Sequence, residues 1–201
     1  GKLVEGNAGN PGQFGAYDPV NGHKKEDPWV YYDYGLDDDE LEKERIRDGA
    51  LFPYMKQVGI YKCPTGARGE TRTYSIMFSI NAICHTGQFH DGWRGKYVKK
   101  MTDIKQPAER IVFIDEGWIT PDAFAVHYNQ ESWWDDAPVR HGTGTCVAFA
   151  DGRAGYRKWK GMDTIKRAKS EEFGHSGNWA PETPEGREDL YWMQRGTWGK
   201  L

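Results

Sequence analysis

The stretch that most constrains the fold is RHGTGTCVAFADGRAGYRKW, residues 140–159. Residues 145–150 read as a β-strand, the dipeptide Asp151-Gly152 follows directly, and a second strand-like run comes after it. Asp-Gly between two such runs is a strong signal for a two-residue turn, because both residues tolerate the positive φ angles of a type I′ turn. The sequence therefore predicts an antiparallel β-hairpin.

The register of this hairpin decides which of its faces is buried. A two-residue turn would place Ala150 opposite Arg153 and Val147 opposite Tyr156. The predicted core face then carries Val147, Phe149, Ala154 and Tyr156. The other face carries the small residues Cys146, Ala148, Ala150 and Gly155.

His141 and Asp151 flank the first strand of the hairpin. A strand advances ~3.3 Å per residue, so these two residues should lie roughly 20 Å or more apart. A proton-transfer pair must approach to within about 3 Å. We therefore expect no catalytic dyad here: Asp151 serves the turn, and the ring of His141 has a buried hydrogen-bonding role.

Composition narrows the class of protein. The chain has 201 residues, a net charge of −3 and no basic stripe, which argues against a nucleic-acid partner. Mean hydropathy is −0.84, and no apolar run approaches the ~20 residues that span a bilayer. Nine tryptophans supply large units of buried area instead. We expect a single globular domain over residues 1–201, with an irregular segment at 1–35.

The remaining pattern predicts an α+β fold. Residues 37–57 read as a helix that begins at Asp37, Asp38 and Asp39, where carboxylates favour the positive helix end. Gly49 and Pro53 indicate a break or kink. Strands are expected near 73, 111, 145 and 153, and sequential strands with tight turns favour antiparallel pairing. The expected architecture is a helix packed on an antiparallel β-sheet with long irregular loops.

Cys63 and Cys84 bracket a strand-like run that could return the chain to its start. A disulfide between them would close a loop of about twenty residues and stabilise the fold by roughly 3 kcal/mol. The alternative is two free, buried thiols.

Several short motifs occur in a particular order. His141 is followed by nine residues and then by Asp151-Gly152, and further matches are LFPYMKQVGIYKCP (51–64), TYSIMFSIN (73–81), QPAERIVFIDE (106–116) and DLYWMQRGT (189–197). This ordered set resembles the prepilin-type processing-associated H-x9-DG proteins, which are related to type II secretion pseudopilins and type IV pilins. The resemblance covers about residues 50–197. Arg153 departs from it, since the family commonly has Asp-Gly-His.

The resemblance implies a pilin- or pseudopilin-like fold and a membrane-anchored protein. Such proteins begin with a cleavable leader and a long apolar helix, and nothing of that kind precedes Gly1 in this chain. We therefore expect the chain to represent the head region, on the periplasmic or extracellular face. The full-length form would be anchored in the inner membrane. The expected partners are other pseudopilin-like subunits or secretion-system proteins.

The leading functional hypothesis is a non-enzymatic structural subunit of a type II secretion or type IV pilus-like system. No G-x-S-x-G, H-E-x-x-H or P-loop motif occurs. An alternative is an extracellular ligand-binding module, perhaps for glycans, that uses exposed tryptophans. The candidates for such a stacking platform are Trp133, Trp134, Trp179, Trp192 and Trp198.

A third hypothesis is a metal-dependent hydrolase. Its candidate ligands are Asp115, Glu116, Asp135, Asp136 and His141. A loop with His85, His90 and Asp91 is a weaker metal candidate. The resemblance also allows a structural calcium ion, but no family ligand motif matches this chain, so no metal ligand and no cofactor is assigned.

Overall fold

The computed structural model describes residues 1, 3–4, 6, 27–31, 38–81, 96–116, 123–170 and 176–199. Within these residues the chain is α+β, as expected. Most of the predicted irregular segment at 1–35 lies outside the described residues.

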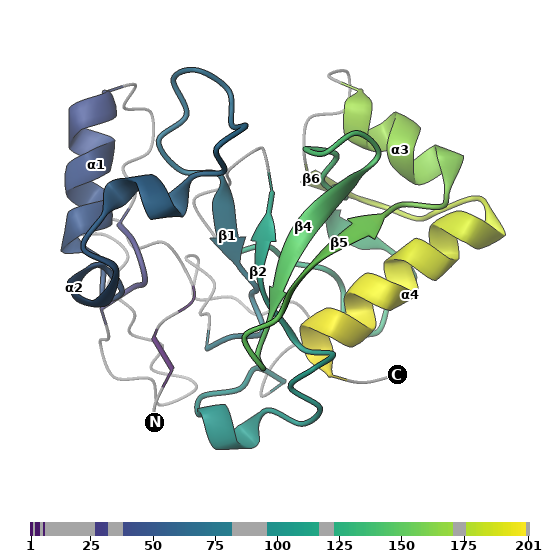
Figure 1. Cartoon of the computed structure of the whole chain (residues 1–201). Coiled ribbons are helices and arrows are strands. Elements are labelled where there is room, and N and C mark those ends of the chain that lie inside the picture. Colours follow the sequence, from purple (N-terminus) through teal and green to yellow (C-terminus); the bar gives the residue numbers. More distant parts are fainter. Residues whose placement is uncertain are drawn as a thin grey trace.

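Four antiparallel strands form the main sheet. They are β1 (Tyr74–Ile76), β2 (Ile111–Asp115), β4 (Gly144–Phe149) and β5 (Ala154–Lys158). Their order across the sheet is β1-β2-β4-β5 (Figure 1). All four strands match the sequence predictions, and β2 lies in the interior of the sheet, as its apolar run indicates.

The β4–β5 hairpin exists, but its turn has three residues and not the predicted two. The backbone N–H of Phe149 donates to the carbonyl of Arg153 at 2.8 Å, and that of Gly152 donates to the carbonyl of Phe149 at 3.0 Å. Gly152 has φ +88°, which is the left-handed conformation of a glycine that closes a type I turn with a bulge. The predicted type I′ turn was therefore wrong.

The longer turn shifts the register of the hairpin by one residue. Val147 pairs with Gly155 and not with Tyr156, which pairs with Cys146. A one-residue slip moves every side chain of one strand to the other face. Tyr156 is accordingly 53% exposed and does not share a core face with Val147.

The predicted N-terminal helix is present and is broken where the sequence indicates. Helix α1 spans Asp39–Asp48 and α2 spans Phe52–Met55. The carboxylate of Asp38 caps α1 by accepting from the N–H groups of Glu40 and Leu41. At Gly49 a Cβ atom would lie 2.3 Å from a backbone oxygen of the chain that crosses it, so only glycine fits.

Two strands, two α-helices and two short 3-10 helices of the described residues were not predicted. Strands β3 (Trp133–Asp135) and β6 (Ser176–Trp179) form a separate two-stranded sheet. Helices α3 (Met162–Lys169) and α4 (Pro184–Trp198) follow the hairpin and lie on its β5 side, opposite α1 and α2 (Figure 1). Short 3-10 helices span Val58–Tyr61 (η1) and Met101–Asp103 (η2).

Tryptophan forms much of the core. Trp29, Trp133 and Trp159 are among the largest fully buried side chains. Trp133 stacks on Trp179 with ring centroids 6.2 Å apart, and Trp159 meets Trp133 edge-on at 5.9 Å. Large aromatic rings thus replace the aliphatic side chains that this composition lacks.

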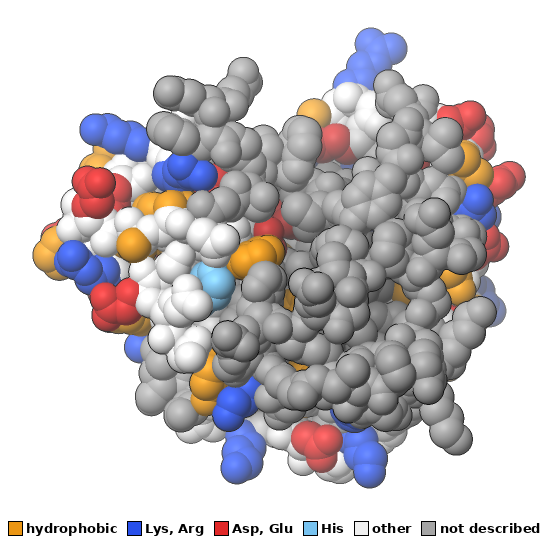
Figure 2. Space-filling view, turned by 180° about the vertical axis from the view of Figure 1, so that it is seen from behind, with side chains coloured by type: hydrophobic (Ala, Val, Ile, Leu, Met, Phe, Trp, Pro, Cys, Tyr) orange, Lys and Arg blue, Asp and Glu red, His pale blue; other side chains and the backbone are white. Residues whose placement is uncertain are grey.

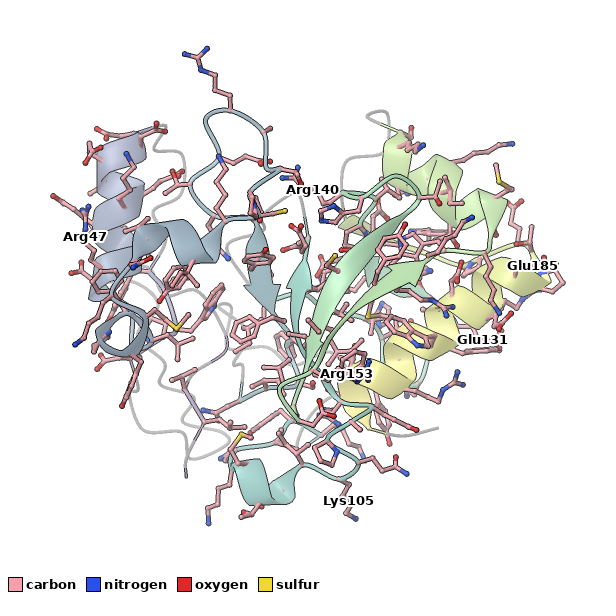
Figure 3. All side chains as sticks on the ribbon, in the orientation of Figure 1. Arg47, Lys105, Glu131, Arg140, Arg153 and Glu185 are labelled. Atoms are coloured by element: carbon pink, nitrogen blue, oxygen red, sulfur yellow. The ribbon has the colours of Figure 1, made fainter. Side chains whose placement is uncertain are left out.

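The charged surface agrees with the near-neutral composition. Seen from behind, Lys/Arg and Asp/Glu side chains are interspersed around the rim of the molecule (Figure 2). Among the described residues, no helix is both long and apolar enough to cross a membrane. Figure 3 shows Arg140 and Arg153 at opposite ends of the β4–β5 hairpin.

Candidate functional site

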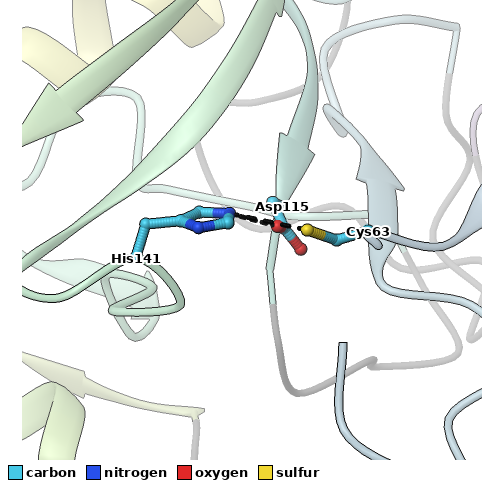
Figure 4. Close-up of side chains that lie close together, drawn as sticks. All are labelled: Cys63, Asp115 and His141. Carbon is cyan, nitrogen blue, oxygen red and sulfur yellow. Dashed lines mark hydrogen bonds and ion pairs between the residues drawn. The ribbon is translucent and has the colours of Figure 1, made fainter. Parts of the chain in front are cut away.

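Three chemically reactive side chains meet at one end of the main sheet. They belong to Cys63, Asp115 and His141 (Figure 4). The His141 Nε2 lies 2.8 Å from the Asp115 Oδ2 and 3.7 Å from the Cys63 Sγ. One ligand atom from each residue lies within 4.8 Å of the other two. We call this group the Cys63–Asp115–His141 cluster.

Strand pairing places Asp115. It is the last residue of β2 and pairs with Tyr74 at the start of β1. The Thr145 hydroxyl, from the second residue of β4, donates to the Asp115 carbonyl at 2.6 Å. Because neighbouring strands run antiparallel, the end of β2 meets the starts of β1 and β4 at the same end of the sheet.

A tight turn holds Cys63 against the same end of the sheet. Its backbone N–H donates to the Thr73 hydroxyl at 2.7 Å, and its carbonyl accepts from the Gly66 N–H at 2.8 Å. The Thr65 hydroxyl lies 3.1 Å from the Cys63 Sγ. The turn around Cys63-Pro64 thus aims the thiol at the sheet.

His141 is fixed through its backbone. Its N–H donates to the Gly144 carbonyl at 3.1 Å, and its carbonyl accepts from the Tyr156 hydroxyl at 2.8 Å. Gly142 has φ +72°, the left-handed conformation that lets the chain turn between His141 and β4. The exposed Tyr156 therefore has a structural task that the predicted hairpin register did not indicate.

The cluster contains a fully buried carboxylate. The Asp115 side chain has no exposed area, and its Oδ1 atom forms no hydrogen bond. The Arg140 guanidinium lies close by, with its Nε 3.9 Å from that oxygen. Arg140 is itself engaged by Glu70 through two hydrogen bonds, at 3.0 and 2.5 Å.

The pKa values of two neighbouring side chains, a tyrosine and a cysteine, are raised in this environment. Burial, together with the negative charges that Cys63 and Asp115 carry when ionised, raises the pKa of Tyr74 to about 12. Burial, followed by the same two groups, also raises the pKa of the Cys146 thiol. Negative charge at the cluster is therefore felt by side chains on both neighbouring strands.

The geometry differs from that of a nucleophilic triad. In such a triad the nucleophile and the orienting carboxylate use different ring nitrogens of the histidine. Here Asp115 Oδ2 and Cys63 Sγ both face Nε2 of His141. Convergence on one nitrogen suits a shared proton or a shared metal ion. A calcium ion does not fit, because it takes six to eight oxygen ligands.

The five proposed hydrolase ligands do not form one site. Asp115 and His141 meet, but the Glu116 carboxylate accepts a hydrogen bond from the Ser75 hydroxyl. Asp135 accepts from the Ala125 N–H at 2.6 Å, and Asp136 pairs with Arg167 at 3.3 Å. Sequence reasoning missed Cys63 as the third member, although the Cys-Pro turn ahead of the first strand was a usable signal.

The two ends of the H-x9-DG motif have different surroundings. The Asp151 carboxylate accepts from the Arg153 N–H at 3.0 Å in the turn, whereas the His141 ring contacts Asp115 and Cys63. These contacts form no His141–Asp151 dyad, as expected. The His141 ring makes the expected hydrogen bond, but it is half-buried and not buried, since 26% of its side chain is exposed.

Other candidates have mixed outcomes. Cys63 is a free thiol in the structure, and Cys84 lies outside the described residues, so the disulfide stays a prediction. His85, His90 and Asp91 also lie outside them. Of the five tryptophans proposed as a platform, Trp133 and Trp198 are buried and Trp134, Trp179 and Trp192 are half-buried.

Comparisons with known proteins leave the family open. No family model matches the chain. No curated protein and no solved structure matches it either.

Proposed function

We propose that the chain is the head of a non-enzymatic, pseudopilin-like structural subunit of a type II secretion or type IV pilus-like system. The observation that supports this proposal is the convergence of three motif segments. Cys63-Pro64, Asp115-Glu116 and His141 carry much of the resemblance, and side chains from all three meet in one cluster.

A structural role accounts for this convergence. Residues 63, 115 and 141 belong to a turn, a central strand and the segment before the hairpin, which lie far apart in sequence. A hydrogen bond to a buried carboxylate joins the last two of these, and the Cys63 thiol contacts the same imidazole. Charge-assisted hydrogen bonds of this kind are roughly twice as strong as neutral ones. The motif residues would then hold the head together and leave its outer surface free for assembly.

The finer details of the proposal follow the same resemblance. The fold would be pilin-like, with an N-terminal membrane helix preceding the head. The protein would act on the periplasmic or extracellular face of the inner membrane, with other pilin-like subunits as partners. The four-stranded antiparallel sheet with α1 and α2 at its β1 side is compatible with such a head.

The experiment that tests this proposal uses the full-length gene product in its native host. It would be tagged at its C-terminus and compared between wild-type cells and cells that lack the prepilin peptidase. We expect peptidase-dependent shortening, recovery in the inner membrane and formaldehyde cross-links to other pilin-like subunits. A product that is neither processed nor cross-linked in wild-type cells would overturn the proposal.

One groove favours a second candidate, the ligand-binding module. It lies between the β4–β5 hairpin and α4 and combines aromatic rings with guanidinium groups: Phe149, Tyr156, Trp192, Arg153, Arg157 and Arg195. Arg157 lies 4.7 Å from the Trp192 ring centroid, so a sugar would have to displace this guanidinium to stack there. Quenching of tryptophan fluorescence by added glycans in wild type but not in Trp192→Phe, with Trp134→Phe as the control, would support this function. Absence of quenching in wild type, or equal quenching in all three proteins, would exclude it.

A further inference from the structure

We propose that Cys63, Asp115 and His141 form a mononuclear binding site for a zinc ion. The site goes beyond the structural role proposed above, because it adds a ligand and a means of controlling the stability of the head. It rests on the chemistry of the three donors, their spacing, a buried oxygen without a hydrogen bond and the local balance of charge.

The donor set selects the class of metal. A thiolate, an imidazole and a carboxylate are the ligands that zinc takes in proteins. Sulfur and nitrogen donors disfavour calcium and magnesium, which prefer oxygen. The metal site considered from the sequence consisted of carboxylates and one histidine, so it gave no reason to include Cys63.

Two of the three donor pairs can be compared with a tetrahedral site, and the third pair, Cys63 and Asp115, has its ligand atoms within 4.8 Å of each other. With Zn–S of about 2.3 Å and Zn–N or Zn–O of about 2.0–2.1 Å, tetrahedral geometry separates neighbouring ligand atoms by about 3.3–3.6 Å. The Cys63 Sγ and His141 Nε2 atoms are 3.7 Å apart. The His141 Nε2 and Asp115 Oδ2 atoms are 2.8 Å apart, a hydrogen-bond distance. The ion would replace the shared proton, and this pair must open by about 0.5 Å to reach the tetrahedral spacing.

Asp115 provides an independent sign of a ligand. Its Oδ1 forms no hydrogen bond to the protein, and its side chain has no area exposed to solvent. A buried acceptor without a hydrogen bond is costly, and a bound ion is one of the standard reasons for its presence. A carboxylate can turn both of its oxygens toward one ion, so an ion held by Oδ2 would also lie near Oδ1. The Arg140 guanidinium at 3.9 Å is too far to donate a hydrogen bond to it.

The charges also match a divalent cation. Ionised Cys63 and Asp115 supply two negative charges, which would balance one Zn²⁺. The nearby positive charge of Arg140 is already compensated by the bidentate contact with Glu70. The ion would therefore not meet an uncompensated cation in the described part of the cluster.

Outer contacts hold each ligand in place. Thr73 fixes the backbone of Cys63, Thr145 fixes that of Asp115, and Tyr156 fixes that of His141. These hydrogen bonds position the backbone of each ligand residue before an ion binds. A bound zinc ion would join the turn, the central strand and the start of the hairpin, and it would leave one coordination position for water or a further ligand.

The test is a metal titration of the purified and reduced protein after treatment with a chelator. Co²⁺ alone reports on the ligands, because a thiolate gives it a near-ultraviolet charge-transfer band and tetrahedral coordination gives it strong visible bands. Zn²⁺ alone is followed by calorimetry and by the thermal unfolding temperature. We expect one equivalent to bind, the thiolate band to appear, and Zn²⁺ to raise the unfolding temperature. Absence of the band and of the temperature shift in wild type would overturn the proposal.

Variants identify the ligands. Cys63→Ser should remove the thiolate band, and His141→Gln should weaken Zn²⁺ binding by more than the roughly 100-fold expected for an outer-shell residue. Cys146→Ser and Cys84→Ser, which remove the other two thiols, should retain the band, and His90→Gln should retain the affinity. Circular dichroism establishes that each variant folds, and Asp115→Asn provides another ligand variant if Cys63→Ser does not.

The controls separate this site from others and from the proposed function. A band that persists in Cys63→Ser or disappears in Cys146→Ser would overturn the assignment. Peptidase processing and subunit cross-linking are read in cells and do not depend on metal titration. Failure of the zinc proposal therefore leaves the structural-subunit proposal to stand or fall on its own experiment.

Discussion

The imidazole of His141 lies within hydrogen-bonding distance of the carboxylate of Asp115, with 2.8 Å between Nε2 and Oδ2, although the two residues are 26 positions apart. Asp151, only ten positions from His141, lies in the exposed turn at the far end of β4. The histidine and the aspartate of the H-x9-DG spacing therefore have separate tasks. The first fixes the chain to a neighbouring strand, and the second closes the hairpin.

This division predicts unequal effects of substitution at the two ends. His141→Ala removes a hydrogen bond to the buried Asp115 carboxylate and should lower the free energy of unfolding by about 1.5–3 kcal/mol. Asp151→Ala removes one exposed contact to the Arg153 N–H and should cost about 0.5–1 kcal/mol. Urea unfolding of both variants beside wild type measures the difference. Equal losses would contradict separate tasks.

The secondary structure that was predictable came from local signals. Asp38 caps α1, Gly49 ends it, and β2 reads as a continuous apolar run. Helix α4 escaped prediction because its sequence, PEGREDLYWMQRGTW, includes two glycines, which are poor helix formers. The Thr183 N-cap followed by Pro184 was a helix-start signal that sequence reasoning did not use. Its stability comes from packing: Gly186 and Gly196 permit close approaches that only the tertiary structure reveals.

The site was predictable only in part, for a related reason. Two members of the site were candidates from the sequence alone: Asp115 at the end of a strand, and His141 of the H-x9-DG motif. Which of the acidic residues would reach His141 depends on strand order, and whether Cys63 joins that pair depends on the direction of its turn. Both are set by non-local contacts. The predicted hairpin register was wrong because Asp-Gly suits both a two-residue turn and a three-residue turn with a bulge.

The bulged turn predicts a specific requirement at Gly152. Its φ of +88° is unfavourable for residues with a Cβ, while no neighbouring atom would meet that Cβ. Gly152→Ala should therefore lower stability by about 1–2 kcal/mol through backbone strain alone. Gly152→Asn should cost less, because asparagine tolerates positive φ. Thermal unfolding distinguishes them, and an alanine variant as stable as the asparagine variant would argue against the left-handed conformation.

The approach of α4 to β2 predicts a second glycine effect, with a partner that can relieve it. A Cβ at Gly196 would lie 2.4 Å from Cδ1 and 2.8 Å from Cγ1 of the buried Ile111. Gly196→Ala should destabilise the protein by about 1–3 kcal/mol through overpacking.

Ile111→Val provides the matched test, because valine lacks the Cδ1 atom of the closest contact. In the double variant the cost of Gly196→Ala should fall by at least about 0.5 kcal/mol relative to its cost in wild type. Denaturant unfolding of the four proteins completes the cycle. Strictly additive losses would show that α4 does not press on β2 at this position.

Asp163 predicts an acid-sensitive link between α3 and α4. Its carboxylate accepts from the backbone N–H groups of Glu182 and Thr183 at 2.8 and 2.9 Å and from the Thr183 hydroxyl at 2.7 Å. Thr183 is the N-cap of α4. Burial by itself raises the pKa of Asp163, but the hydrogen bonds from Thr183, Glu182 and Thr164 outweigh it and leave the pKa lowered.

A lowered pKa fixes the sign of the pH dependence. The unfolded chain binds the proton more readily, so this contribution to stability is complete above the unfolded pKa of about 3.9 and is lost as pH falls through the folded value. Asp163→Asn should therefore be less stable than wild type at pH 7, with the difference narrowing below about pH 4. Urea midpoints at several pH values measure both proteins. Parallel curves would show that ionised Asp163 does not hold the start of α4, whereas converging curves would assign to this one carboxylate a share of the acid sensitivity of the α3–α4 junction.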